Sequence, residues 1–155
     1  MEEKTKVSQT NQIGPYIVLG ELGKGGMGAV YKVISGSNQI YALKIILDKD
    51  SFEKDSKKRF VREIQMLSQI EHPNIIKIYD VGDWMGRPYF VMDYIEGTNL
   101  ANYLDSKRKI PQKEAVEIMR KVTLAIAAIH KVGIIHRDIK PENIMLVKGE
   151  PFLMD

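Results

Sequence analysis

A short polar segment, residues 136–143, constrains the fold of this chain more than any other feature. Its sequence is His-Arg-Asp-Ile-Lys-Pro-Glu-Asn, so a carboxylate (Asp138), an ammonium (Lys140) and an amide (Asn143) fall within six residues. A long apolar pattern of helical spacing precedes the segment, and the apolar run Ile144 to Val147 follows it. Rigid elements at both ends of a loop fix the geometry of its polar groups. An ordinary solvated loop is the alternative, which the bare His-Arg-Asp tripeptide would favour but the whole string does not.

Length and composition are those of one soluble globular domain. The chain has 155 residues, of which 44% are hydrophobic and 28% charged. Its net charge of +3 is too balanced to indicate nucleic-acid binding, and the lack of cysteine excludes disulfides and thiolate metal sites and suits the cytosol. No apolar run approaches the roughly 20 residues of a membrane span. The first 11 residues are polar and lack the apolar core of a signal peptide.

The first part of the chain has the pattern of short strands joined by short connections, which predicts an antiparallel meander. The predicted strands are residues 16–19, 29–34 and 39–47. Between the first two lies the motif Gly23-x-Gly25-x-x-Gly28. Dinucleotide-binding folds share this spacing, but there the glycines open a helix. Here β-branched and aromatic residues follow, so we predict a hairpin whose tip lets backbone N–H groups approach a phosphate closely.

Lys44 lies inside the third predicted strand, where a lysine taken alone would usually face solvent. A helix is predicted from Asp55 to Glu71, because Phe60, Ile64, Leu67 and Ile70 recur at helical spacing. Glu63 falls on the same buried face as these residues. A carboxylate in a buried stripe is costly unless it is paired. We therefore predict an ion pair between Lys44 and Glu63.

Near Gly97 the pattern changes from strands to helices. Two further strands are predicted at residues 75–81 and 88–94, and two helices at residues 100–109 and 111–130. Gly133 is placed to end the second helix. The predicted core stripe of that helix is Ala115, Ile118, Met119, Val122, Ala125, Ile126 and Ile129.

In this order the motifs resemble those of the eukaryotic-like (Hanks-type) serine/threonine protein kinases, and within them the bacterial branch. The resemblance covers about residues 16–155. It rests on Gly23, Gly25, Gly28, Lys44, Glu63, His136, Arg137, Asp138, Lys140, Asn143 and Asp155. It implies an α+β, two-lobe fold. A flexible tail (1–13) would precede an antiparallel five-stranded small lobe with one helix (14–97), followed by the first part of a mainly helical large lobe (98–155).

The function implied by the resemblance is transfer of a phosphoryl group from Mg-ATP to a serine or threonine hydroxyl of a protein substrate. Asp138 would accept the hydroxyl proton, and Lys140 would neutralise the transferring group. Lys44, held by Glu63, would clamp the nucleotide phosphates. We expect a cytoplasmic protein with no nucleic-acid partner and no membrane segment within this chain.

The resemblance also implies the residues that bind the nucleotide and its metal. Asn143 and Asp155 would hold Mg²⁺, with Mn²⁺ as an alternative ion. Met92 would guard the back of the nucleotide pocket, and the backbone of residues 93–95 would read adenine. The full set implied for ATP is Leu22, Gly23, Gly25, Gly26, Gly28, Val30, Ala42, Lys44, Met92, Asp93, Ile95 and Met145.

At its last residue, Asp155, the chain stops where the family continues with Phe-Gly, an activation segment and most of the large lobe. We therefore expect a kinase catalytic domain that is incomplete and inactive as it stands. The alternative is a nucleotide-binding fragment or interaction module without catalysis. A small-molecule kinase of the same fold is also open, although Asp138-x-Lys140-x-x-Asn143 favours a protein substrate.

Overall fold

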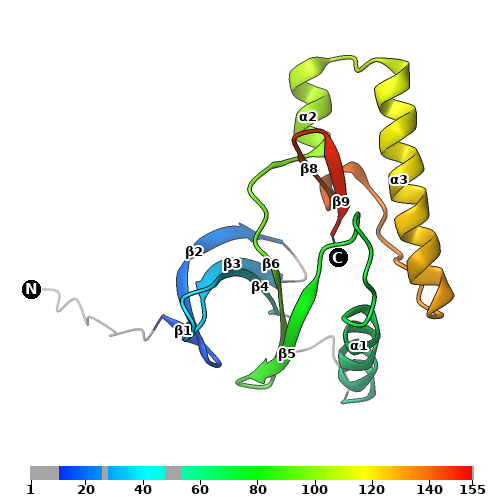
Figure 1. The fold of residues 1–155 in the computed structure, drawn as a ribbon. Helices are drawn as coiled ribbons and strands as arrows, with labels where there is room; N and C mark the ends of the chain where they lie inside the picture. The colour runs from blue at the N-terminus through cyan, green and yellow to red at the C-terminus, as the bar shows by residue number, and fades with distance from the viewer. Residues whose placement is uncertain (1–10, 26–27, 48–53, 155) are drawn as a thin grey trace, which may run out of the picture.

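Two structural parts make up the protein, and a computed structural model describes them over residues 11–25, 28–47 and 54–154. A curled antiparallel sheet with one helix forms the first part, and two helices with a small sheet form the second (Figure 1). The sheet of the first part has the strand order β1-β2-β3-β4-β6-β5. Its elements are β1 (Gln12–Ile13), β2 (Tyr16–Lys24), β3 (Gly28–Ile34), β4 (Ile40–Ile46), α1 (Lys54–Leu67), β5 (Ile78–Trp84) and β6 (Arg87–Asp93).

All five strands expected in this sheet are present, and the described residues add a sixth. The additional strand, β1, pairs Ile13 with Tyr16 of β2 across a turn in which Gly14 has a φ of +55°. Residues 12 and 13, which the sequence assigned to a tail, therefore belong to the sheet, and Ile13 is buried. The sheet also extends farther along the glycine hairpin than expected, because β2 continues to Lys24.

The connection between α1 and β5 belongs to the second part of the molecule. We predicted a strand from Ile75, but β5 begins only at Ile78. The residues before it pair with β9 (Glu150–Leu153) instead: Leu153 N–H donates to the Asn74 carbonyl at 2.7 Å, and Ile76 N–H donates to the Leu153 carbonyl at 3.1 Å. The two parts are thus joined by backbone hydrogen bonds as well as by the chain itself.

The second part packs helices against a three-stranded sheet of order β7-β8-β9. Its elements are β7 (Thr98–Asn99), α2 (Leu100–Lys107), α3 (Gln112–Lys131), a 3₁₀ turn (Pro141–Asn143), β8 (Ile144–Val147) and β9. The predicted stripe of α3 does form the core through Ile118, Val122, Ala125 and Ile129. Met119 was wrongly included, because its position on α3 leaves it half exposed.

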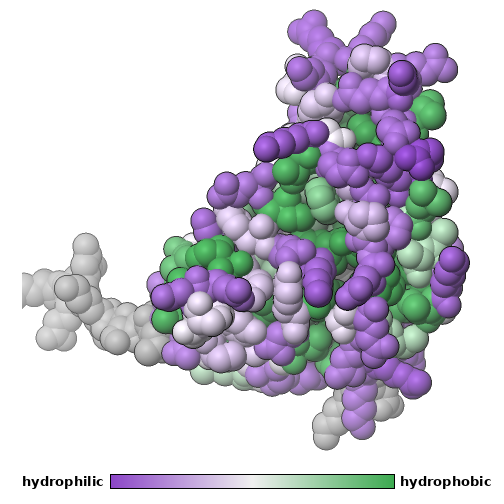
Figure 2. All heavy atoms as spheres, viewed as in Figure 1, coloured by the Kyte–Doolittle hydropathy of each residue, from purple (hydrophilic) through white to green (hydrophobic). Residues whose placement is uncertain are grey.

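Hydrophilic residues cover the end of the molecule that carries the α2–α3 turn, whereas apolar residues are visible nearer the middle of the face shown in Figure 2. Within the described part of the chain, no helix combines the length and apolar character needed to cross a bilayer.

Candidate active site

The polar loop after α3 is held in place on both sides by residue 154. Met154 N–H donates to the Asn143 carbonyl at 2.9 Å, and His136 Nε2 lies 2.8 Å from the Met154 carbonyl. The other ring nitrogen of His136 accepts a hydrogen bond from Asp138 N–H at 3.3 Å. With both ring nitrogens engaged, His136 has a structural role in this loop. It ties the loop to the end of β9.

Within this loop the side chains of Asp138, Lys140 and Asn143 come together. Asn143 Nδ2 donates to Asp138 Oδ2 and to the Asp138 backbone carbonyl, both at 2.9 Å. Lys140 Nζ lies 3.0 Å from the same Oδ2. The Asp138 side chain is 57% exposed, so a second molecule has access to it. A carboxylate is therefore presented in a fixed position with an ammonium group beside it.

The hydrogen bond from Lys140, followed by that from Asn143, holds the pKa of the Asp138 carboxyl below its usual range. Hydrogen bonds that favour the charged form act in this direction, and the nearby ammonium adds to them. Asp138 is consequently ionised at neutral pH. Such a group is a weak base but a good acceptor for the hydrogen of a hydroxyl group.

Four residues expected to line a nucleotide pocket meet in one apolar cluster between the sheet and α1. Ala42 of β4 lies opposite Met92 of β6, and both are buried. Val30 and Ile95 pack against the same cluster. Three strands and the segment after β6 therefore bring together residues that are up to 65 positions apart in the chain.

Beside this cluster the segment after β6 borders a hollow of about 300 Å³, whose lining includes Asp93, Ile95, Val147 and Phe152. Met145 lies opposite Phe152 in the pairing of β8 with β9. Leu22, by contrast, is about half exposed on β2. The predicted lining residues thus come from both parts of the molecule, with Met145 from the second.

The backbone N–H of Asp93 is not available to donate to adenine, because it already forms a hydrogen bond. Its N–H donates to the Lys77 carbonyl at 3.0 Å. Its carboxylate accepts hydrogen bonds from Tyr79 Oη at 2.7 Å and from Lys77 N–H at 3.1 Å. These bonds fix the end of β6 against β5. Any donor for adenine in the predicted segment therefore comes from Tyr94 or Ile95.

Glycine is used at different positions of the hairpin for different structural reasons. Gly25 N–H donates to the Gly28 carbonyl at 2.8 Å, which closes the hairpin. A Cβ at Gly28 would collide with the backbone carbonyl of Ile45, so β3 packs against β4 only with glycine here. A Cβ at Gly23 or Gly25 would meet no atom within 4 Å. Packing explains Gly28, whereas Gly23 and Gly25 leave open backbone at the tip. Gly26 and Asp155 lie outside the described residues.

Glu63 forms an ion pair with Arg137 rather than the predicted one with Lys44. Glu63 Oε1 lies 3.4 Å from Nη2 of Arg137, the arginine of the polar loop. The Glu63 side chain is 32% exposed, so α1 does not bury it as the apolar stripe suggested. Because Arg137 has a φ of +68°, its backbone conformation differs from that of its neighbours. The acid of α1 is therefore joined to the loop rather than to β4.

Asn74 is a structurally important residue that sequence reasoning missed. It is 5% exposed, and Nδ2 donates to Glu150 Oε1 and to the Pro151 carbonyl, both at 2.9 Å. These bonds fix the start of β9, whose end leads to Met154 and the polar loop. Nothing in the residue pattern marks it, since an asparagine after a proline is ordinarily an exposed turn residue.

A family model described as "Protein kinase domain" matches residues 16–155. The chain belongs to the protein kinase family. It is 39% identical over 135 residues to the serine/threonine-protein kinase PrkC of Bacillus subtilis, a match that covers 86% of this chain and 21% of that protein. It is also 35% identical to PknD of Mycobacterium tuberculosis, covering 94% of this chain and 22% of that one.

Solved structures agree with this assignment of the fold. The crystal structure of the Mycobacterium tuberculosis PknI kinase domain superposes with a TM-score of 0.86 at 27% identity. The match covers 96% of this chain and 61% of that one. The chain thus has a kinase fold, and it spans about a fifth of the length of the curated relatives named above.

Proposed function

We propose that this chain supplies the nucleotide-binding part and the catalytic loop of a protein kinase that phosphorylates serine or threonine. The observation that carries the proposal is the Asp138 carboxylate, exposed on one side and held by Lys140 at 3.0 Å and Asn143 at 2.9 Å. The relatives that are named serine/threonine kinases support the choice of acceptor. Since a protein kinase uses cytosolic ATP, we place the domain in the cytoplasm.

In the proposed reaction, the hydroxyl oxygen of the substrate attacks the γ-phosphorus of ATP and the bond to the ADP oxygen breaks. The hydroxyl proton passes to Asp138. A loose transition state needs positioning more than a strong base, which suits a carboxylate of lowered pKa. Lys140 offsets the negative charge of the transferring group. We assign Lys44, on the strand opposite Val30, to the nucleotide phosphates.

The residues present fit a hard divalent cation. Asn143 uses its nitrogen to bind Asp138, which leaves its Oδ1 as a neutral oxygen ligand. Asp155 would add a carboxylate, and Mg²⁺ and Mn²⁺ both accept this type of ligand. Once bound, the ion would neutralise charge on the ATP phosphates. Groups of three or more acids or histidines that could hold a metal are not found among the described residues, which do not include Asp155.

An Asp138→Asn variant of the full-length protein tests this function. We expect the rate of phosphoryl transfer from ATP to a serine peptide to fall by about 10²–10⁴-fold with little change in ATP affinity, because an amide cannot accept the proton. Asp105→Asn is the matched control, since Asp105 is an exposed acid on α2. Wild-type protein that binds ATP but transfers no phosphate would instead support a nucleotide-binding module without catalysis.

A further inference from the structure

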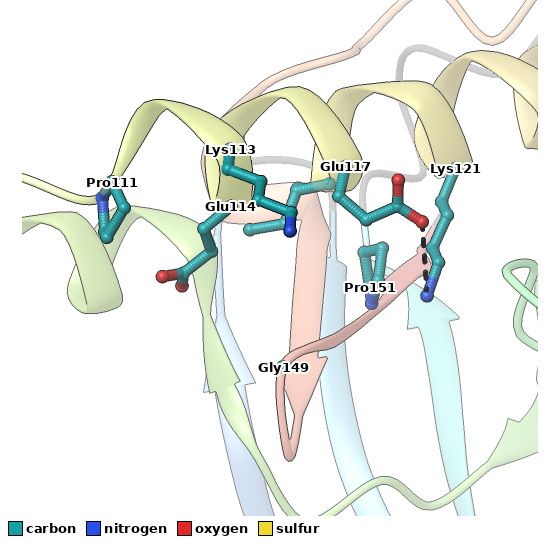
Figure 3. Close-up of a pocket in the computed structure, with 8 residues that line it drawn as sticks. Pro111, Lys113, Glu114, Glu117, Lys121, Gly149 and Pro151 are labelled. Atoms are coloured by element: carbon teal, nitrogen blue, oxygen red, sulfur yellow. Dashed lines mark ion pairs between the residues drawn. The ribbon is translucent and has the colours of Figure 1, made fainter.

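A second hollow, of about 370 Å³, lies between the first half of α3 and the β8–β9 turn (Figure 3). It shares no lining residue with the candidate active site or with the hollow beside the segment after β6. Its volume is at the lower end of the range for small-molecule or side-chain binding sites.

Apolar groups form the base of this hollow. Ile118 and Pro151 are buried beneath it, and Pro111 closes the end at the start of α3. At the β8–β9 turn, Gly149 leaves open space where a side chain would otherwise stand. An apolar side chain of a partner would therefore find apolar contacts here.

The acidic residues around this hollow already have partners. Glu114 accepts a hydrogen bond from Tyr103 Oη at 2.5 Å. Glu117 accepts two from Arg120, at 2.6 and 3.0 Å. Lys121 Nζ, which lies 4.0 Å from Glu117, donates to Glu150 at 2.5 Å. The hydrogen bonds from Arg120 and Lys121 lower the pKa of Glu117 and Glu150 respectively, so both acids are ionised and compensated at neutral pH.

The basic residues beside the hollow are different. We call Arg108, Lys109, Lys113 and Lys148 the basic rim. Lys113 lines the hollow, and Lys148 is next to the lining residue Gly149. Arg108 and Lys109 lie in the adjoining α2–α3 turn. All four are exposed, and none forms an ion pair with another described residue. Asp105, exposed on α2, and Glu114, whose partner Tyr103 carries no charge, offset two of these charges. The charge left uncompensated around the hollow is therefore positive.

We propose that the hollow and the basic rim form a docking site for an acidic linear segment of a protein substrate, with one apolar side chain of that segment in the hollow. The identity of the partner as a substrate rests on the proposed kinase function, whereas the binding itself does not. Nucleic acid or an anionic membrane would need only the surface charges. The apolar base is what favours a peptide, as in other modes of linear peptide recognition.

Binding of a fluorescein-labelled peptide tests this site. The probe is a short peptide of aspartate and glutamate with one central leucine, measured by fluorescence anisotropy with the full-length protein in the absence of nucleotide. We expect the charge-reversing double variant Lys109→Glu/Lys113→Glu to bind the peptide at least about tenfold more weakly than wild type. A tenfold rise in Kd corresponds to about 1.4 kcal/mol of binding free energy. The double variant Lys58→Glu/Arg62→Glu makes the same change in net charge at exposed positions of α1 and should bind like wild type.

Replacing the central leucine of the probe by serine should weaken binding to the wild-type protein several-fold. Equal binding of the leucine and serine peptides would overturn the proposal, because the surface would then attract any polyanion. It would equally be overturned if both double variants lost affinity alike, or if the wild-type protein bound neither peptide. The binding measurement contains no ATP, so its outcome does not depend on catalysis. Protein that binds the probe but, in a separate assay with Mg-ATP, fails to phosphorylate a serine peptide would refute the kinase function and leave the docking site standing.

Discussion

At the scale of single residues, Asn74 shows how a buried amide can support a site that it does not touch. Its side chain donates hydrogen bonds to two acceptors at the start of β9. Its backbone carbonyl accepts a third hydrogen bond, from Leu153 N–H at 2.7 Å. The main chain then continues through Met154 to the contacts with His136 and Asn143. Asn74 therefore helps to position the polar loop, residues 136–143.

We predict that Asn74→Ala lowers the free energy of unfolding by about 1–3 kcal/mol, because it leaves the buried Pro151 carbonyl without its donor and removes a hydrogen bond to Glu150. Asn102→Ala should stay within about 0.5 kcal/mol of wild type, since Asn102 is an exposed residue of α2. Urea denaturation of the full-length protein measures both values. If the two variants were equally stable, the buried hydrogen bonds of Asn74 would not matter for the fold.

A substitution of Lys44 tests whether this residue binds the ATP phosphates. We predict that Lys44→Met removes most phosphoryl transfer while the protein stays folded, because the methionine keeps the side-chain length and lacks the charge that would hold ATP phosphates. The measurement is transfer to a serine peptide, with circular dichroism to follow folding. Lys58→Met, at an exposed position of α1, is the control. Activity within a few-fold of wild type would show that Lys44 does not hold the phosphates.

The sequence alone predicted the parts of the site that lie close together in the chain. Asp138, Lys140 and Asn143 lie within six successive positions, so any compact loop brings their side chains near one another. The partner of Glu63 was predicted wrongly because it depends on how α1 is rotated against the sheet. A helical period indicates which residues share a face but not how far that face turns toward β4. Arg137, 74 residues away, is the partner that this rotation selects.

At the scale of elements, the glycine hairpin separates two reasons for using glycine. Gly28 is needed because a Cβ at this position would collide with the Ile45 carbonyl on the neighbouring strand. Gly25 has open space around it, so its lack of a side chain matters only when another molecule approaches. The same motif therefore contains a packing position, Gly28, and an open position, Gly25, which we propose for nucleotide binding.

We predict that Gly28→Ala destabilises the protein by about 1–3 kcal/mol, as overpacking of a core does. Gly25→Ala should leave the free energy of unfolding nearly unchanged and weaken ATP binding, since a methyl group would stand where phosphates approach the backbone. Thermal denaturation and nucleotide titration of the two variants separate the effects. The opposite pattern, with a stable Gly28→Ala and an unfolded Gly25→Ala, would contradict this division.

Strands with an internal pattern were predictable, and strands defined only by their partners were not. The strands β3, β4 and β6 carry β-branched or aromatic runs and appeared where expected. β7 has two residues, and β9 begins Glu-Pro, so neither has a recognisable pattern. Both exist because β8 offers its two edges to them. The late start of β5 has the same cause, because Ile75 bridges to Leu153 of β9.

At the scale of the whole molecule, two main-chain connections among the described residues join the sheet to the helical part. One is the covalent segment after β6, where Gly97 packs so closely on the Leu146 carbonyl that a side chain would collide with it. The other is the pairing of residues 74–76 with β9. Both connections reach the β8–β9 hairpin. The polar loop, which precedes β8 directly, therefore takes its position from the sheet as well as from α3.

The last prediction concerns residues 1–155 as a separate polypeptide. On α3, Val116, Met119 and Leu124 are 60%, 50% and 50% exposed. Full burial of one exposed side chain of this size is worth about 1.5–3 kcal/mol, and these three are about half exposed, so covering them would contribute about half of that value each to a typical stability of about 5–15 kcal/mol. The PknI kinase domain is longer than this chain, which covers 61% of it. We expect residues 1–155 alone to associate with increasing concentration and to transfer no phosphate to a serine peptide. Light scattering and a radiolabelled transfer assay measure the two properties. A monodisperse preparation of residues 1–155 that phosphorylates the peptide, and loses that activity on Asp138→Asn, would show instead that the catalytic loop is rigid enough without further packing on α3.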